Sequence, residues 1–370
     1  MKILQLMGGV IRRGGEEMFV LGFLKAFDRQ GYDFDCLVIE DCGNDDFKNE
    51  IESRGGSLYE LNIPLHATRF SNHIYKPVKR FFAEHSYDVV HIHSSSIAAI
   101  ALLAAAADRS GVKKIVVHSH STGKSDSFEH KLFRFLASLS ERRHADVYCA
   151  CSREAALWKF APKYADRAVI IKNGVDTRRF RFDPDRREQT RKRLGIGGGC
   201  FVVGHVGRLC DTKNQKFLLC AFEYISKKIP DSRLLLTGDG DDGEALKELA
   251  RQKGFADRLI LTGGVNDVEN YLFAMDVFAF PSLFEGFGIV AVEAQCAGLP
   301  VVASKGVPSE VAVTDDVSFL GIENEPSAYR EWADKLCSYR DAPRRDNSDR
   351  VREAGYDIRS TVEQLKKIYS

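Results

Sequence analysis

The sequence has no uninterrupted apolar run near the roughly 20 residues that a membrane-spanning helix requires. Its opening residues, MKILQLMGG, are typical of a short strand followed by glycines, and they lack the charged start and long apolar core of a secretion signal. Both absences argue against an integral membrane protein or a secreted one. We expect a cytoplasmic protein, or at most one that lies peripherally on the inner face of the plasma membrane.

The chain also lacks an excess of charge of either sign, and it lacks cysteines paired at C-x2-C spacing. The chain has 53 basic and 52 acidic side chains, so its overall charge gives no attraction to nucleic acid. None of the 9 cysteines forms a C-x2-C pair, and Cys149 and Cys151 stand one residue apart on an expected strand. This pattern indicates free thiols in a reducing compartment.

Short apolar runs alternate with amphipathic stretches along the whole chain, as strands covered on both faces require. The expected strands include KILQL (2–6), DVVHI (88–92), KIVVH (114–118), AVIIK (168–172), FVVGHVG (201–207), RLLLTG (233–238) and VFAFP (277–281). This alternation predicts an α/β protein with parallel sheets. At 370 residues the chain is long enough for two Rossmann-like domains, which we expect to face each other across a cleft.

The domain boundary is expected in a charge-rich passage, residues 172–199, that is bounded by glycines and has little apolar periodicity. This places an N-terminal domain at 1–172 and a C-terminal domain at 173–355. Residues 356–370 end in VEQLKKIYS, which is amphipathic and predicts a helix.

The segment FPSLFEGFGIVAVEAQCAGLP, residues 280–300, predicts a strand, a glycine-bracketed turn and a short helix. A turn of this kind exposes free N–H groups at the start of the helix, where the helix dipole favours a phosphate. Glu285 lies in the turn and Glu293 lies eight positions further on, so two carboxylates could hold hydroxyl groups at two ends of one ligand. Alternatively, Glu293 is an ordinary helix-start carboxylate.

These residues resemble the E-x7-E signature of the retaining glycosyltransferases of family 4, which have the two-domain GT-B fold. The resemblance extends over the C-terminal half, where Gly-Arg-Leu and Lys-Asn in VVGHVGRLCDTKNQKFLLCAF (202–222) are similar to the family's G-R-L-x-x-x-K-N element. Further similarity lies in LLLTGDG (234–240), LTGGVNDVENYLFAMDVFAFPS (261–282) and LPVVASKGVPSEV (299–311). The first half of the chain matches the family more loosely. Because the family's C-terminal helix packs back on the N-terminal domain, the resemblance implies the same position for the helix expected in residues 356–370.

Two basic residues follow the strand 201–207 at an offset that lets both project from its carboxyl end, where a diphosphate would lie. They are Arg208 and Lys213. With the amides of Gly286, Phe287 and Gly288 they could stabilise the departing diphosphate in place of a metal ion. Alone, either cation could equally be a solvated loop charge.

The resemblance implies roles for further residues. Glu293 would hold the ribose hydroxyls and Glu285 the transferred sugar, while Gly238 and the pair Val265 and Asn266 would line the nucleotide. No metal-ligand cluster is recognised in the sequence, because the two Asp-x-Asp pairs fall on a strand start and in a glycine turn, where aspartate usually bonds its own backbone. We expect no metal and no other cofactor.

Histidines follow two expected strands of the first half. By family resemblance His120 would contact the donor sugar or its phosphate, and it could change charge near neutral pH. His118 is expected on the opposite side of the extended chain, in a structural role. His91 and His93 are candidate groups on the acceptor side.

A glycine-rich loop, MGGVIRRGGEE (7–17), follows the first strand and resembles a phosphate-cradling loop, although it does not fit G-x-G-x-x-G. Gly14 and Gly15 would let the backbone approach a ligand closely, or the loop is a turn without a ligand. Two basic amphipathic segments, 75–82 and 130–144, could lie on anionic lipid or could be ordinary helices with a charged side.

The resemblance implies a retaining, metal-independent glycosyltransferase. It would move a hexose or an N-acetylhexosamine from a nucleotide sugar, most simply a UDP-sugar, to a hydroxyl of a glycan or a polyprenyl-linked glycan in cell-surface polysaccharide synthesis. Front-face substitution and a covalent intermediate on Glu285 both stay open. The alternatives are a non-catalytic glycan-binding scaffold and a UDP-sugar epimerase or phosphorylase-like enzyme. Lys305 stands where the family often has an acidic residue.

Overall fold

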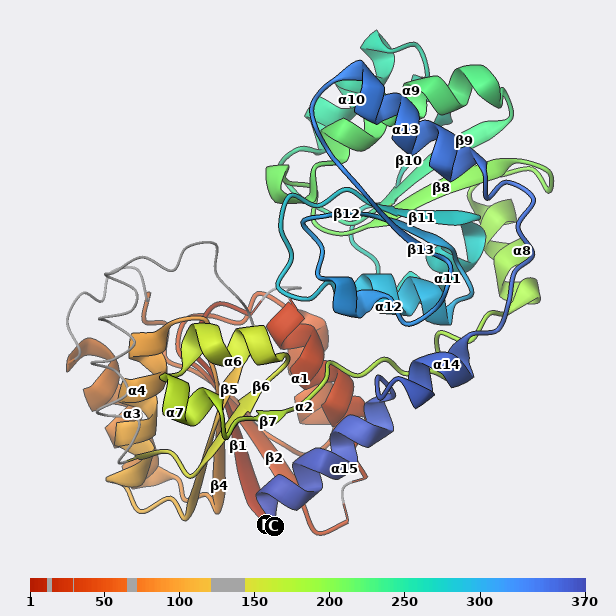
Figure 1. Ribbon diagram of the computed structural model, residues 1–370. Helices are drawn as coiled ribbons and strands as arrows, with labels where there is room; N and C mark the ends of the chain where they lie inside the picture. The colour runs from red at the N-terminus through yellow and green to blue at the C-terminus, as the bar shows by residue number, and fades with distance from the viewer. Residues whose placement is uncertain (12–14, 29, 65–71, 121–143) are drawn as a thin grey trace. The chain divides into compact units, whose positions relative to one another are not determined.

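The computed structural model of the chain describes residues 1–11, 15–28, 30–64, 72–120 and 144–370. The chain divides into two compact units, and each is described by itself (Figure 1). The first unit comprises Met1–Gly174 together with Asp357–Ser370, and the second comprises Val175–Tyr356.

The first unit is built on a parallel seven-stranded sheet in the order β3-β2-β1-β4-β5-β6-β7. Its strands are β1 (Lys2–Met7), β2 (Asp33–Val38), β3 (Leu58–Glu60), β4 (Val89–His93), β5 (Lys114–Ser119), β6 (Val147–Ala150) and β7 (Val169–Ile170). Its described helices are α1 (Gly15–Ala26), α2 (Asp45–Ser53), α3 (Asn72–Glu84), α4 (Ile97–Asp108), α6 (Arg153–Lys159), α7 (Pro162–Ala165) and α15 (Ile358–Tyr369).

The inner strands of the first sheet, β2, β1, β4, β5 and β6, are buried on both faces, as their apolar runs require. On one face Leu4 and Leu6 pack with residues of α3 and α4, and on the other Ile3 and Met7 pack with residues of α1, α2 and α15. The second face also carries Gln5, which is fully buried between these two apolar positions. A polar side chain at this position requires hydrogen-bond partners inside the core.

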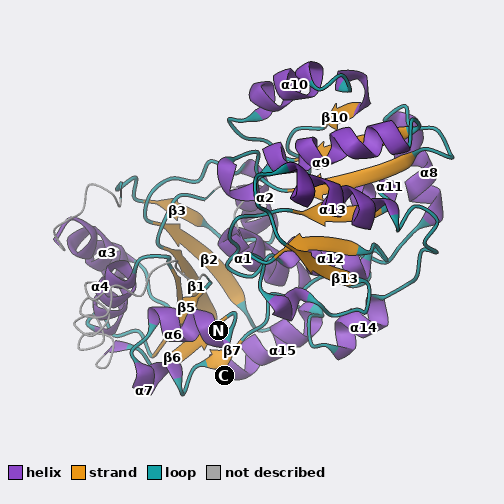
Figure 2. Ribbon diagram, turned by 45° about the horizontal axis from the view of Figure 1, so that its top comes forward, coloured by secondary structure: helices purple, strands orange, loops and turns teal. Residues whose placement is uncertain are grey.

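The second unit has a parallel six-stranded sheet in the order β10-β9-β8-β11-β12-β13. Its strands are β8 (Phe201–Val206), β9 (Ser232–Thr237), β10 (Leu259–Leu261), β11 (Val277–Phe280), β12 (Val301–Ser304) and β13 (Val317–Leu320). Its helices are α8 (Pro184–Arg193), α9 (Gln215–Lys228), α10 (Gly243–Gln252), α11 (Val268–Ala274), α12 (Ile289–Cys296), α13 (Pro326–Cys337) and α14 (Ser348–Glu353), with short 3-10 turns η2 (Asp211–Lys213), η3 (Ala256–Arg258) and η4 (Ser309–Val311). Two apolar clusters cover its two faces. Figure 2 distinguishes the strands from the helices that flank them.

The predicted α/β architecture of two parallel Rossmann-like sheets is confirmed. The run 168–172 forms only the two-residue strand β7. The passage 172–199 is not a bare connection, because it contains α8, whose residues pack in the second unit. Proline at the first turn of α8 and the side chain of Asp183, which accepts from the amides of Asp185 and Arg186, start this charged helix.

Helix α15 belongs to the first unit although it is far from that unit in sequence. Ile358, Val362, Leu365 and Tyr369 recur at helical spacing and are all buried in the cluster that includes α1. Figure 1 shows α15 beside α1. Burying side chains of this size stabilises by about 1.5–3 kcal/mol each, so the first unit depends on this helix.

Gly174 is expected to be indispensable where the chain leaves the first unit. A Cβ there would lie 2.5 Å from the Cα of Ile358 and 2.7 Å from the Oγ1 of Thr361. We predict that Gly174→Ala lowers the free energy of unfolding by about 1–3 kcal/mol, because α15 must shift to admit the methyl group. Chemical unfolding followed by circular dichroism measures it. The control Gly197→Ala adds a Cβ with nothing within 4 Å, and equal losses in both variants would contradict the prediction.

Candidate active site

In the second unit the candidate residues gather where the strand order reverses. Strands β8 and β11 are neighbours at the centre of the sheet, and the chain continues to opposite sides from them. Such a switch point leaves a space at the carboxyl ends of the strands, which is where open α/β sheets bind ligands. Lys213 follows β8 and Glu285 follows β11, and the Lys213 ammonium lies 2.5 Å from the Glu285 carboxylate. The two side chains predicted to serve different parts of the donor therefore form one ion pair.

The loop after β8 is held by buried polar groups. The Nδ1–H of His205 donates to the carbonyl of Ala279 at 2.9 Å, which leaves Nε2 to accept from the Gln215 amide at 3.3 Å. Gln215 also donates to the carbonyl of Arg208 at 2.8 Å. The backbone of Arg208 is thus fixed while its side chain is exposed, and among the described residues it has no acidic partner.

Two glycines are required by the turns around this space. Gly238 has φ +142°, and a Cβ there would lie 2.1 Å from the carbonyl oxygen of Gly207. Gly288 has φ +86°, and a Cβ there would lie 2.8 Å from the ring of Phe280. Both positions therefore exclude a side chain, and the backbone itself faces the end of the sheet.

Helix α12 begins directly after this turn, with Gly288 at its N-cap. Within the described chain, the amides of Gly286, Phe287 and Gly288 donate to no protein acceptor, whereas the amide of Glu285 donates to the carbonyl of Gly306 at 3.1 Å. The side chain of Phe287 is buried and stacks on Tyr356, with ring centroids 5.4 Å apart. Phe287 can therefore offer a ligand its amide, while its ring belongs to the core.

Glu293 lies in the second turn of α12 and is partly buried. Burial raises the pKa of Glu293 to about 7, the Arg179 guanidinium opposes this shift and the Glu269 carboxylate adds to it. Arg179 donates to Glu269 at 2.7 Å and to the carbonyl of Asn266 at 2.6 Å. The E-x7-E spacing located Glu293, but nothing in the sequence singled out Arg179 or Glu269.

Val265 and Asn266 lie in the loop between β10 and α11. Val265 is partly buried against the core, and Asn266 is exposed with its carbonyl held by Arg179. The loop that the resemblance assigns to the nucleobase is thus tied to the same arginine that lies beside Glu293.

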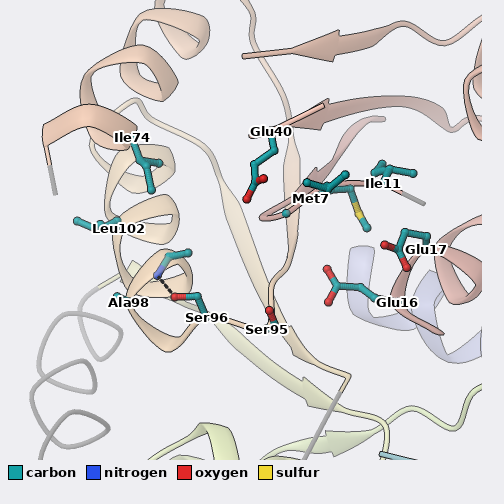
Figure 3. A pocket seen from close by; sticks show the side chains of 13 residues that line it. Met7, Ile11, Glu16, Glu17, Glu40, Ile74, Ser95, Ser96, Ala98 and Leu102 are labelled. Carbon is teal, nitrogen blue, oxygen red and sulfur yellow. Dashed lines mark hydrogen bonds between the residues drawn. The ribbon is translucent and has the colours of Figure 1, made fainter. Parts of the chain in front are cut away.

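In the first unit a cavity of about 530 Å³ opens at the corresponding switch point, between β1 and β4. Figure 3 shows Glu16 and Glu17 of α1 and Glu40 after β2 around it, with Ser95 and Ser96 after β4. Burial first, and then the neighbouring Glu17, raises the pKa of Glu16 to about 7. Gly15 begins α1 beside this cavity, whereas Gly14 lies outside the described residues.

Four histidines stand on one face of β4 and β5 and in the residue after β5. The rings of His118 and His120 stack with centroids 4.0 Å apart, so the expectation that they lie on opposite sides is wrong. Positions two apart on a strand share a face. His91 and His93 join the same group, with their centroids 4.1 Å apart. Burial lowers the pKa of His120 to about 3 and those of His91, His93 and His118 well below their usual value, so all four are neutral.

His91, His93 and His118 each offer a nitrogen within 4.8 Å of the others, a grouping not anticipated from the sequence. Their nitrogens are already engaged: His91 bonds Tyr369 and His118, and His93 bonds Gln5 and His120. Of the ring nitrogens of these three histidines, only Nε2 of His118 lacks a hydrogen-bond partner within the described chain. The arrangement is a hydrogen-bonded group of neutral rings.

The basic segment 75–82 belongs to α3, where Phe81 and Phe82 are buried and Lys76, Lys79 and Arg80 are exposed. This is the pattern of a helix with a solvated charged side. The other basic segment, 130–144, lies outside the described residues except for His144. Within the described parts of the chain, none of the helices has the length and apolar character to span a bilayer.

Comparison with known families and structures agrees with this geometry. The model of "Glycosyltransferase Family 4" matches residues 13–179, and that of "Glycosyl transferases group 1" matches residues 186–356. The chain therefore belongs to the family 4 glycosyltransferases and carries both of their domains. The protein is therefore a hexosyltransferase, and the family predicted from the sequence is confirmed.

Among its relatives is the putative glycosyltransferase EpsF of Bacillus subtilis, 27% identical over 100% of this chain and 96% of that protein. A UDP-Gal:alpha-D-GlcNAc-diphosphoundecaprenol alpha-1,3-galactosyltransferase of Escherichia coli is 32% identical over 62% of this chain and 60% of that protein. The crystal structure of Anabaena Alr3699/HepE in complex with UDP-glucose superposes with a TM-score of 0.75, at 23% identity over 99% of this chain and 98% of that one. The last likeness confirms the GT-B fold.

The raised pKa of Glu293 is expected to make stability depend on pH. Its pKa is about 7 in the folded protein against an ordinary 4.5, so the folded state keeps a proton that the unfolded chain releases. The stability that this group contributes is complete below about pH 4.5 and declines as the pH rises to about 7. Glu293→Gln should therefore raise the Tm by roughly 2–4 °C at pH 8 and leave it unchanged at pH 4.5. The exposed Glu331→Gln is the control, and an equal gain at both pH values would contradict the prediction.

The buried histidines are expected to have the opposite dependence. His91, His93 and His118 are neutral when folded, but the unfolded chain binds protons below about pH 6.5. Stability is therefore lost as the pH falls below 6.5, by up to about 1.4 kcal/mol per pH unit for each ring. Urea unfolding between pH 7.5 and 5 measures this slope. The exposed His73→Asn should retain it, and a flat profile in the wild type would refute it.

Proposed function

We propose that this enzyme is a retaining, metal-independent hexosyltransferase whose donor is a UDP-sugar. The observation that carries the proposal is the ion pair between Lys213 and Glu285 at the switch point of the second sheet, beside the amides of Gly286, Phe287 and Gly288. A nucleoside diphosphate gains negative charge as it leaves, and a fixed cation with N–H groups at a helix start stabilises that charge without reorganisation. These groups could supply what Mg²⁺ supplies elsewhere.

Glu293 and Glu285 are placed so that their carboxyl groups could bind the two ends of one nucleotide-sugar donor. The raised pKa of Glu293 and the nearby Arg179 guanidinium let this carboxyl group hydrogen-bond ribose hydroxyls in a partly buried setting. Glu285 is paired with Lys213, and its carboxylate could accept hydrogen bonds from the hydroxyls of the transferred sugar while the lysine binds the diphosphate. The loop that contains Val265 and Asn266 would then border the base.

The mechanism we favour is front-face substitution, in which the leaving phosphate accepts the proton of the acceptor hydroxyl. An ion pair with Lys213 makes the Glu285 carboxylate a weaker nucleophile, which argues for a role in orienting the sugar rather than in forming a bond to it. Excluding water from the bound donor would limit hydrolysis.

UDP is favoured as the nucleotide because the structural neighbour HepE was solved with UDP-glucose and a relative is named for UDP-galactose. That galactosyltransferase is also named for a diphosphoundecaprenol acceptor. We propose a hydroxyl of a glycan or a lipid-linked glycan as the acceptor, bound in the first unit, and action in the cytoplasm or at the inner face of its membrane. The cavity that holds Glu16, Glu17 and Glu40 presents hydrogen-bond acceptors to such hydroxyls.

Nucleotide binding tests the donor half. Calorimetry with EDTA present should give binding of UDP in preference to GDP and ADP, weakened about tenfold or more in Lys213→Ala, because a charge-assisted hydrogen bond is worth about 1.5–3 kcal/mol. Glu293→Ala should also weaken binding. Lys247→Ala removes an exposed lysine of α10 and serves as the matched control. Binding that requires Mg²⁺, or that ignores Lys213, would refute the metal-independent site.

Donor hydrolysis or transfer separates the enzyme from a glycan-binding scaffold. Wild type should release UDP from a UDP-sugar, and Glu285→Ala should abolish that release while it still binds UDP. A protein that binds UDP but releases none from any UDP-sugar, with or without acceptor, would favour the scaffold.

A further inference from the structure

A continuous hydrogen-bonded chain runs through the core of the first unit from α15 to the carboxyl end of β5. The hydroxyl of Tyr369 bonds Nδ1 of His91 at 2.8 Å and lies 3.4 Å from the amide nitrogen of Gln5. The amide oxygen of Gln5 bonds Nε2 of His93 at 2.8 Å, and Nδ1 of His93 bonds Nε2 of His120 at 2.8 Å. Gln5 and His93 are fully buried, so water cannot substitute for either partner.

With the amide oxygen of Gln5 facing His93, the position of each proton follows from the chemistry of the groups. An amide oxygen only accepts, so Nε2 of His93 must carry a hydrogen. A neutral imidazole has one N–H, which leaves Nδ1 of His93 as an acceptor, and Nε2 of His120 must then donate to it. The second nitrogen of His120, Nδ1, is therefore a bare lone pair, and it is buried without a partner within the described chain.

The other branch of the chain is consistent with the same orientation of Gln5. Its amide nitrogen donates to the Tyr369 oxygen, the Tyr369 hydroxyl donates to Nδ1 of His91, and Nε2–H of His91 donates to Nδ1 of His118 at 3.2 Å. Turning the Gln5 amide over would reverse every donor and acceptor in both branches. The orientation of one side chain thus decides which nitrogen of His120 carries its proton.

The histidine rings cannot readily turn over to restore a broken hydrogen bond, because neighbouring rings pack against them. Phe19 packs against His118 and His120, with ring centroids 4.9 Å apart in both cases, and the two histidines stack on each other. Ring positions are therefore fixed by packing, and the hydrogen-bonded chain is left to choose the tautomer.

We propose that Gln5 and Tyr369 are positioning residues that hold His120 in its neutral Nε2–H tautomer, so that Nδ1 carries a lone pair that can accept a hydrogen bond but cannot donate one. The family resemblance implies that His120 contacts the donor sugar or its phosphate, and this tautomer would favour the sugar, whose hydroxyl groups can donate to Nδ1. A phosphate is excluded as its partner, because an anion requires an N–H donor or a cation at that atom. The consequence for catalysis rests on the proposed transfer function, whereas the tautomer itself does not.

The test is the nitrogen NMR spectrum of the protein labelled with ¹⁵N in histidine, because two-bond couplings distinguish the two neutral tautomers from each other and from imidazolium. The His120 signals are assigned by their loss in His120→Ala. In the wild type they should show Nε2–H and bare Nδ1 at pH 7. Gln5→Leu and Tyr369→Phe should give a mixture of both tautomers at His120, whereas Tyr32→Phe, which changes a tyrosine packed on the same cluster, should not.

Two results would overturn the inference: an Nδ1–H tautomer of His120 in the wild type, or a spectrum that Gln5→Leu leaves unchanged. Retention of zinc by the purified protein, with His91, His93 and His118 deprotonated at the bound nitrogens, would overturn it as well, since these nitrogens would then be ligands.

Kinetics separate this inference from the proposed function. Gln5→Leu and Tyr369→Phe should lower kcat about tenfold or more with little change in KM for the donor, as expected when a hydrogen-bonding group presents the wrong tautomer. If His120→Ala leaves transfer unchanged while the tautomers are as stated, the role of His120 in transfer fails and its tautomer assignment stands. If the tautomer shifts in neither variant, the inference fails whatever the activity.

Discussion

Parallel pairing at the middle of each sheet is the constraint on which both candidate sites depend. In the first sheet β1 pairs with β4, and in the second β8 pairs with β11. In both cases the chain leaves these neighbours in opposite directions, so the space beyond their carboxyl ends is not closed by a connection. Each unit can therefore line that space with short loops and a helix N-terminus while its central strands stay covered on both faces.

The two sites differ in the sign of the charge that they present. The second unit places Arg208, Lys213 and unpaired backbone amides around its space, a combination suited to phosphate. The first unit places three carboxylates around its cavity. A diphosphate would be repelled by the first set and attracted by the second, so the charges favour the second unit as the binding site of a nucleotide.

The fold could be predicted from the sequence because strands that are buried on both faces are encoded by continuous, mainly apolar runs, as in FVVGHV of β8 and VFAF of β11. Glu285, Glu293 and Lys213 could be named because their spacing resembles that of a known family. The ion pair between Lys213 and Glu285 could not be predicted, because side chains 72 residues apart in the sequence meet only once the strand order is known. Gln5, Arg179 and Tyr369 were missed for the same reason. A polar residue inside an apolar run, as at Gln5 in KILQLM, was the one local signal available.

The membership of α15 in the first unit has a consequence for the order of events during synthesis. Residues 1–174 leave the ribosome well before Ile358, Val362, Leu365 and Tyr369 have been made, and these four side chains complete the core beneath α1. The second unit, Val175–Tyr356, is contiguous in sequence and can finish folding as soon as it emerges. The unit that is synthesised first is therefore the unit whose core is completed last, because its histidine-lined face stays uncovered until α15 has been made.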